Sequence, residues 1–255
     1  MIRKLNKILV IEPMFSENLF LKKKLLKCFK NVTFNYKKVN KSKVINLLKN
    51  KEGLILGLQP FDEDVVNSAK NLKIVAKFGT GLDNVDLKAC KKNNIKVINA
   101  PKLNSISVAE LVLSCAINLK RNINTNHLHM KNGTWKKVEG SEIYKKKVGI
   151  IGLGAAGKEV AKRFFSFGSV LYANDIDYDE KFLKKYNIKK TSKLNILKSC
   201  DIITLHVPLT KKTYNLINND NLKFLKKNTI LINTSRGSVL NLNDLNKIKN
   251  KKNLS

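Results

Sequence analysis

The sequence predicts an α/β protein built from two doubly wound parallel-sheet domains. Three observations support this fold class. Strand-like apolar segments alternate with helical patterns through the first hundred residues, one long helical pattern follows, and a second alternating series then begins at a glycine-rich turn. Alternation of this kind favours a parallel sheet with helices on both faces. We therefore expect one domain at 1–99 and another at 100–255.

The first hundred residues contain five strand-like segments separated by four helical patterns. The strand-like segments lie at 7–11, 32–36, 54–58, 74–76 and 96–98, and the helical patterns lie at about 18–30, 43–49, 62–69 and 87–93. In a sheet built this way, ligands are expected at the carboxyl ends of the strands.

A change of pattern after Pro101 indicates the domain boundary. Residues 105–119 are predicted to form a connecting helix, because apolar residues recur there at helical spacing. These residues are Val108, Leu111, Val112, Cys115 and Leu119. A polar segment without periodicity follows at 121–147, and its stretch NTNHLHMKNG is interpreted as a loop. His127 and His129 in that stretch have no nearby Cys, Asp or Glu, so no metal site is expected.

The second series begins with VGIIGLGAAGKEVAKRFF at 148–165. Residues 148–151 have the apolar character of a strand buried on both faces, and a G-x-G-x-x-G turn follows at Gly152, Gly154 and Gly157. The first glycine allows a tight turn, the second lets the backbone approach a pyrophosphate, and the third lets the helix pack closely on the strand. The N–H groups at the helix start then hold the phosphates. One helix face is expected to carry Val160, Ala161, Phe164 and Phe165.

Asp175 ends the next predicted strand, 170–174, eighteen residues beyond Gly157. A carboxylate at this place accepts hydrogen bonds from ribose hydroxyls and repels a 2′-phosphate, which favours NAD over NADP. Because Asp177 and Asp179 are close by, each of the three acids also has a simpler interpretation as a solvated residue at a strand end.

Five strands are predicted in the second domain, at 148–151, 170–174, 188–190, 201–206 and 230–233, before a helical stretch at 243–248. A dinucleotide fold with strand order 3-2-1-4-5-6 has a sixth strand. Segment 230–233 would then be an exposed apolar edge, which proteins usually cover. The expectation is therefore a domain that lacks its last strand.

Two residues at strand ends are candidates for chemistry. Arg236 follows strand 230–233, and its planar guanidinium suits a substrate carboxylate. The alternative is a surface arginine paired with an acid. His206 ends strand 201–206, where a proton carrier is conceivable. Because no carboxylate follows it closely, a structural role is favoured for His206.

The stretch KFGTGLDNVD follows strand 74–76. Gly79 and Gly81 free the backbone there, and consecutive N–H groups in such a turn can bind a carboxylate. The alternative is an ordinary glycine turn capped by Asp83.

Composition limits the remaining classes. The formal charge is +31, but it comes from lysines spread along the chain with only four arginines, so no specific nucleic-acid partner is expected. No apolar run approaches the roughly 20 residues that span a bilayer. We expect no membrane association and a cytoplasmic location.

Several stretches together resemble the D-isomer-specific 2-hydroxyacid dehydrogenases. They are KFGTGLDNVDLKAC, NAPKLNSISVAELVLSCAINLKRNI, GTWKK, VGIIGLGAAGKEVAKRFFSFG, SCDIITLHVPLTKKTYNLIN and ILINTSRGSVLN, within about 73–243. The resemblance implies a flavodoxin-like substrate domain, a Rossmann domain that binds NAD, and a homodimer formed through the connecting helix and segment 121–147. It implies hydride transfer with D-2-hydroxyacids, with 3-phosphoglycerate, as in serine biosynthesis, expected first and hydroxypyruvate or glyoxylate as alternatives.

The resemblance also implies roles for individual residues. Arg236 falls on the family's catalytic arginine. The implied cofactor-binding residues are Gly152, Gly154, Ala155, Ala156, Gly157, Asp175, His206, Val207, Pro208, Thr213, Thr234, Ser235 and Ser107. The implied substrate-binding residues are Lys77, Phe78, Gly79, Thr80 and Asn84.

This chain departs from the family pattern in three places. Leu103 replaces a usual glycine, and Lys77 replaces a usual arginine. The family's catalytic Glu and His lie beyond the fifth strand, and neither residue type follows Arg236 here. The expectation is an amino-terminal part of the enzyme, and the alternative is an NAD-binding remnant or regulatory protein without turnover.

Overall fold

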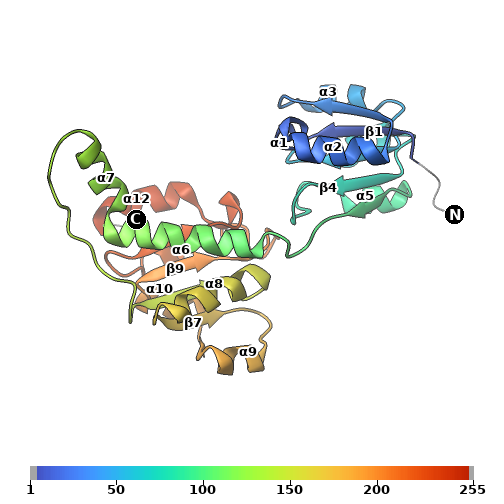
Figure 1. Cartoon of the computed structure of the whole chain (residues 1–255). Coiled ribbons are helices and arrows are strands. Elements are labelled where there is room, and N and C mark those ends of the chain that lie inside the picture. Colours follow the sequence, from blue (N-terminus) through green and yellow to red (C-terminus); the bar gives the residue numbers. More distant parts are fainter. Residues whose placement is uncertain (1–4, 253–255) are drawn as a thin grey trace. The chain divides into compact units, whose positions relative to one another are not determined.

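Two parallel sheets form the framework of the computed structural model, which describes residues 5–252 (Figure 1). The chain divides into one unit at Met1–Leu103 and another at Asn104–Ser255. Five strands make up each sheet within the described residues, in the orders β2-β1-β3-β4-β5 and β10-β9-β6-β7-β8, and all their pairings are parallel. The predicted α/β class with two doubly wound sheets is confirmed.

The first unit alternates strands and short helices. Its strands are β1 (Lys7–Ile11), β2 (Asn31–Asn35), β3 (Gly53–Leu56), β4 (Ile74–Lys77) and β5 (Lys96–Ile98). Its helices are α1 (Pro13–Glu17), α2 (Leu19–Cys28), α3 (Lys41–Leu48), α4 (Glu63–Ser68) and α5 (Leu87–Lys92). Buried side chains of α3, α4 and α5 pack on one sheet face to form the core of this unit.

The second unit begins with two helices and continues as a second alternating series. Its strands are β6 (Lys147–Ile151), β7 (Val170–Asn174), β8 (Lys189–Lys190), β9 (Ile202–Leu205) and β10 (Ile230–Asn233). Its α-helices are α6 (Ser105–Arg121), α7 (Ile123–Lys131), α8 (Ala155–Ser166), α9 (Glu180–Lys185), α10 (Lys193–Ser199), α11 (Asn219–Leu222) and α12 (Leu242–Lys252). Helices α6, α8 and α9 pack on one sheet face, and α10 and α11 on the other.

Helix α6 packs on the second sheet through small residues rather than through its leucines. Ala109, Val112 and Ala116 are fully buried, whereas Leu111 is 54% exposed and Leu119 is 40% exposed. The predicted helix is present, and small residues form its buried face because α6 packs closely against α8.

The polar segment after α6 contains a helix that the sequence did not predict. Asn122 has φ +51°, so it ends α6 and begins α7 in a new direction. The Asn126 side chain then accepts from the Val138 N–H at 2.8 Å and donates to its carbonyl at 3.2 Å. His127 and His129 therefore lie on a helix, and the loop prediction was wrong.

Helix α8 buries three of the four apolar residues expected on one of its faces. Val160, Ala161 and Phe164 are fully buried against the second sheet. Phe165 is 42% exposed and makes an edge contact with Tyr186 at a ring distance of 5.5 Å.

Candidate functional site

The glycine turn after β6 is closely packed, and its geometry requires glycine at two positions. Gly152 has φ +96°, and a Cβ there would lie 2.6 Å from the carbonyl of His206. A Cβ on Gly157 would lie 2.0 Å from the Gly152 carbonyl oxygen. The turn therefore lies directly against the end of β9, and the first turn of α8 packs onto it.

The start of α8 offers a site for an anion. Its N-cap residue is Gly154, and no side chain caps the helix. The first N–H groups of a helix have no intrahelical partners, and they carry the positive end of its dipole. No atom lies within 4 Å of the position that a Cβ on Gly154 would occupy. This open space beside Ala155 and Ala156 fits the diphosphate of a dinucleotide.

The carboxylate of Asp175 is fixed beside this turn. It accepts hydrogen bonds from the N–H groups of Leu153 and Ile176, the latter at 2.6 Å. The Asp175 N–H donates to the Tyr178 hydroxyl at 3.0 Å, a contact that the sequence did not indicate. Asp179 instead pairs with Lys158 at 2.7 Å, which lowers the pKa of its carboxyl group. Of these two acids, Asp175 is therefore the one held at the turn.

His206 links the end of β9 to the same turn. Its backbone N–H donates to the Ile151 carbonyl at 2.7 Å. The imidazole Nε2 lies 2.8 Å from the hydroxyl oxygen of buried Thr204. Burial lowers the pKa of His206 to about 4, so its imidazole is neutral at pH 7. The backbone of His206 therefore joins the ends of β9 and β6, while its neutral imidazole contacts Thr204 on its own strand.

Stability is expected to fall as the pH drops from about 6.5 toward 4. An unfolded chain binds a proton on His206 throughout this interval, whereas the folded protein does not. The full difference corresponds to about 3 kcal/mol. Urea unfolding at several pH values measures it, and the slope should flatten in His206→Gln. An unchanged slope in that variant would contradict the assignment.

The loop after β9 is closed by Thr213. Its hydroxyl donates to the Pro208 carbonyl at 2.5 Å and accepts from the Thr210 N–H at 2.7 Å. Val207 also lies at the turn, because its backbone nitrogen is 2.9 Å from the position that a Cβ on Gly152 would occupy.

The loop after β10 is arranged by Asn233, a residue that the sequence did not single out. Its side-chain oxygen accepts from the Ser235 N–H at 3.1 Å, and its amide donates to the Arg236 carbonyl at 2.9 Å. Arg236 is partly buried and donates from Nη1 to the Ser235 carbonyl at 2.9 Å. Thr234 Oγ1 is buried without a partner among the described residues, as expected for an atom that a ligand can satisfy. An Asn at the end of an apolar strand was the available signal.

Ser107 lies on the first turns of α6 with an exposed side chain. Within residues 5–252, no recorded hydrogen bond joins it to the Gly152 turn. The structure therefore brings together the strand-end residues of β6, β7 and β9, and does not link Ser107 to them.

The substrate-binding residues predicted in the first unit follow β4. Lys77 is 7% exposed, and its Nζ donates to the Gly57 carbonyl at 2.6 Å. Asn84 donates to the carbonyls of Gly57 and Gln59 at 3.0 and 2.6 Å. Both side chains therefore brace the loop after β3. Phe78 is partly exposed, Gly79 has φ +135°, and the Thr80 carbonyl accepts from Asn99 at 2.6 Å.

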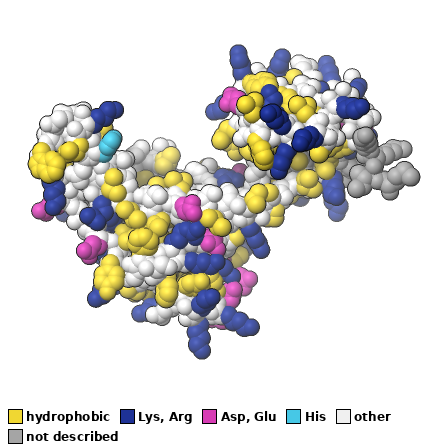
Figure 2. Space-filling view, viewed as in Figure 1, with side chains coloured by type: hydrophobic (Ala, Val, Ile, Leu, Met, Phe, Trp, Pro, Cys, Tyr) yellow, Lys and Arg dark blue, Asp and Glu magenta, His cyan; other side chains and the backbone are white. Residues whose placement is uncertain are grey.

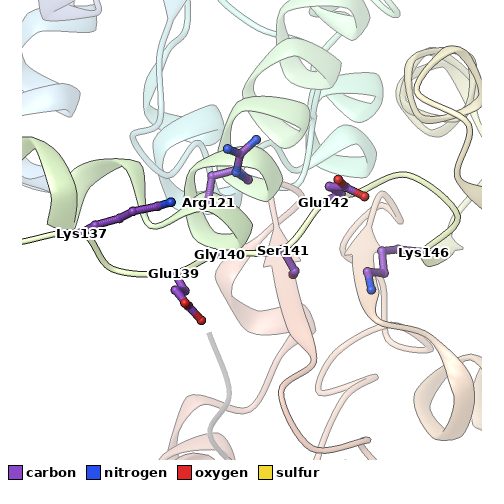
Figure 3. A pocket seen from close by; sticks show the side chains of 7 residues that line it. All are labelled: Arg121, Lys137, Glu139, Gly140, Ser141, Glu142 and Lys146. Carbon is purple, nitrogen blue, oxygen red and sulfur yellow. The ribbon is translucent and has the colours of Figure 1, made fainter.

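A separate surface pocket of about 490 Å³ lies at the end of α6 (Figure 3). It is lined by Arg121, Lys137, Glu139, Gly140, Ser141, Glu142 and Lys146. Lys146 directly precedes β6, so the pocket lies at the opposite end of that strand from the Gly152 turn. None of the predicted site residues lines it.

Two kinds of site are absent from the residues that the structure describes. No group of three or more His, Cys, Asp or Glu side chains is arranged to hold a metal ion. No described helix is long and apolar enough to cross a membrane.

The second sheet, read from β8 to β10, has the strand order 3-2-1-4-5 of dinucleotide-binding Rossmann domains, and its first strand leads into the glycine turn. Comparison with known proteins then identifies the family. Residues 113–255 match the NAD-binding domain of the D-isomer specific 2-hydroxyacid dehydrogenases. The chain belongs to this family and contains its NAD-binding domain, which confirms the family, and the cofactor NAD, predicted from the sequence.

Individual relatives give the range of similarity. A D-3-phosphoglycerate dehydrogenase of Methanocaldococcus jannaschii is 38% identical over 180 residues, which cover 69% of this chain and 34% of that protein. A hydroxypyruvate reductase of Thermotoga maritima is 37% identical, covering 69% of this chain and 58% of that protein. The chain therefore matches about a third of the first relative and less than two thirds of the second.

Solved structures support the fold across nearly the whole chain. A D-lactate dehydrogenase from Aquifex aeolicus, crystallised with NAD and lactic acid, is 27% identical with a TM-score of 0.84. The match covers 98% of this chain and 74% of that one.

Proposed function

We propose that this protein is an NAD-dependent oxidoreductase of D-2-hydroxyacids, which transfers a hydride between the substrate C2 carbon and the nicotinamide C4 carbon while the proton of the C2 hydroxyl is exchanged with water. One observation carries the proposal. The turn from Gly152 to Gly157 leads into an uncapped helix, and the carboxylate of Asp175 is held against it by the Leu153 N–H.

The start of α8, Asp175 and Arg236 each bind a different part of the cofactor or substrate in this proposal. The N–H groups of Ala155, Ala156 and Gly157 bind the diphosphate, and Asp175 accepts hydrogen bonds from the ribose hydroxyls. When bound, NAD supplies the carbon that accepts or donates the hydride. Arg236 binds the substrate carboxylate through its guanidinium.

The remaining assignments follow from the family resemblance and from local geometry. On the cofactor side, we assign His206, Val207, Pro208, Thr213, Thr234, Ser235 and Ser107. On the substrate side, we assign Lys77, Phe78, Gly79, Thr80 and Asn84. The buried hydroxyl of Thr234 supports the first group, because it has no partner among described residues. The buried ammonium of Lys77 supports the second, because it is a cation at a strand end.

The names of the relatives supply two candidate substrate pairs. One pair is 3-phosphoglycerate and its 2-oxoacid. The other pair is hydroxypyruvate and the 2-hydroxyacid formed when it is reduced. Both pairs share a carboxylate and an adjacent carbon that changes between alcohol and ketone, which are the features that Arg236 and the nicotinamide require.

Two measurements on the purified chain test the function. NADH fluorescence titration measures cofactor binding, and the loss of NADH absorbance measures reduction of hydroxypyruvate, 3-phosphohydroxypyruvate and glyoxylate. Binding together with turnover of at least one 2-oxoacid supports the proposal. Binding without turnover of any 2-oxoacid supports an NAD-binding protein without catalysis.

We also propose that the chain forms a homodimer through α6 and segment 121–147. Large apolar side chains on this surface are exposed, including Leu111, Ile123 and Trp135, the last at 88%. Figure 2 shows hydrophobic side chains at the outer end of this segment, among basic side chains scattered over the visible face. Exposed apolar surfaces of this kind are typical of subunit interfaces.

The variant Leu111→Glu is expected to be monomeric, because it would bury a charge in the interface. Light scattering at micromolar concentration measures the mass of the wild type and the variant. Leu19→Glu, at an exposed leucine of α2, is the matched control and should leave the dimer intact. A monomeric wild type would refute the proposal.

A further inference from the structure

The carboxyl edge of the first sheet contains a topological switch point. β1 pairs with β2 on one side and with β3 on the other. Successive strands are therefore added on opposite sides of β1, although all strands are parallel. In open parallel sheets, ligands bind at such a point. The segments that emerge there are α1 with its N-cap after β1, and residues 57–59 after β3. Lys77 and the residues after it follow the adjacent β4.

Glu12 places a carboxylate at this point. It is the N-cap residue of α1, and its Oε1 accepts from the Met14 N–H at 3.3 Å. Its Oε2 lies only 1.7 Å from the position that a Cβ on Gly57 would occupy, so the carboxylate rests directly against Gly57. The Gly57 carbonyl accepts from Lys77 Nζ at 2.6 Å. One acidic and one basic side chain therefore contact the same residue.

Two buried oxygens belong to the same segments. Ser16 Oγ, on α1, and Gln59 Oε1, after β3, are both buried and have no hydrogen-bond partner among the described residues. Phe15 and Phe78 touch edge to face at a ring distance of 5.5 Å, which fixes α1 against the loop after β4. Buried oxygens without partners cost free energy, and a donor on a ligand would satisfy them.

The chemistry of these groups distinguishes between possible ligands. Glu12 and the Gln59 side-chain oxygen are acceptors, and Ser16 can donate or accept. A ligand hydroxyl donates to such oxygens. A phosphate monoester carries up to two negative charges, so it faces repulsion from Glu12 and offers few or no donors.

We propose that the β1–β3 switch point of the first unit binds the hydroxyl-bearing, unphosphorylated end of a small hydroxyacid, and that Glu12 excludes phosphorylated ones. The inference rests on the proposed function for the identity of the ligand as a 2-hydroxyacid. It favours a glycerate-like substrate over 3-phosphoglycerate.

Protein-detected NMR of the full chain tests the inference. D-glycerate and 3-phospho-D-glycerate are titrated separately, and the amide signals of Gly57, Phe78 and Gly79 report binding. Glycerate should bind at least tenfold more tightly than its phosphate ester. In Glu12→Gln, which keeps an oxygen for the Met14 cap, this ratio should fall about tenfold. Equal or tighter binding of the phosphate ester to the wild type would overturn the inference.

Two further variants control for folding and position. Glu17→Gln, at the far end of α1, should leave the ratio unchanged. Ser16→Ala removes a buried oxygen without a partner, so it should keep or raise the melting temperature while weakening glycerate binding. Unchanged glycerate binding in Ser16→Ala would count against the site.

The same samples separate this inference from the proposed function. NADH is added and followed through the amide signals of Gly152, Gly154 and Gly157. Absence of NADH binding with glycerate selectivity intact would refute the oxidoreductase alone. NADH binding and turnover with no selectivity at the Gly57 amide would refute the subsite alone.

Discussion

Gly157→Ala is expected to destabilise the second unit and to abolish NADH binding. The new Cβ would lie 2.0 Å from the Gly152 carbonyl oxygen and 3.0 Å from its carbon. Both are backbone atoms of a turn packed against the end of β9, so neither can move independently. We expect a loss of roughly 3 kcal/mol or more in the free energy of unfolding, measured by urea denaturation.

Gly154→Ala is the matched control for this effect. No atom lies within 4 Å of its Cβ position, and its φ of −69° suits any residue. The variant should therefore be as stable as the wild type. It should still bind NADH more weakly, because the methyl group occupies the space through which the diphosphate approaches the backbone. Wild-type NADH affinity in both variants would contradict the assigned diphosphate site.

Asp175→Asn is expected to remove the preference for NADH over NADPH. The charge of Asp175 repels a 2′-phosphate, while the asparagine oxygen can still accept from the Leu153 N–H and keep the turn in place. We expect the ratio of the two dissociation constants to fall roughly a hundredfold. Fluorescence titrations with both cofactors measure this ratio.

Asp177→Asn controls for a general change in charge on the same loop. Its backbone N–H contacts Asp175 at 3.4 Å, but its side chain is exposed to solvent. The cofactor ratio should therefore stay at the wild-type value. A shift of equal size in Asp175→Asn and Asp177→Asn would show that net charge, and not the ribose contact, sets the preference.

The strands and the glycine turn could be predicted because local patterns specify them. Apolar runs such as 148–151 end at a glycine whose positive φ few other residues tolerate. Helix α7 was not predicted because its Asn-rich sequence lacks a continuous apolar face. Its position depends on the hydrogen bonds between Asn126 and Val138. The exposure of Leu111 and Leu119 on α6 could not be predicted, because sequence periodicity shows an apolar stripe but not which surface covers it.

Residues that act through tertiary contacts lay beyond sequence patterns. Asn233 orders the loop before Arg236 by accepting hydrogen bonds from two groups of Ser235. Glu12 reaches Gly57 across 45 residues of sequence, which only the pairing of β1 with β3 brings together. Such contacts arise from sheet order, and no local motif encodes them.

A crystal structure of the chain with NADH tests the central claim most directly. The account predicts the diphosphate within hydrogen-bonding distance of the N–H groups of 155–157, with the adenosine ribose hydroxyls on Asp175. A cofactor bound elsewhere, or a turn that stays closed to NADH at saturating concentration, would contradict it.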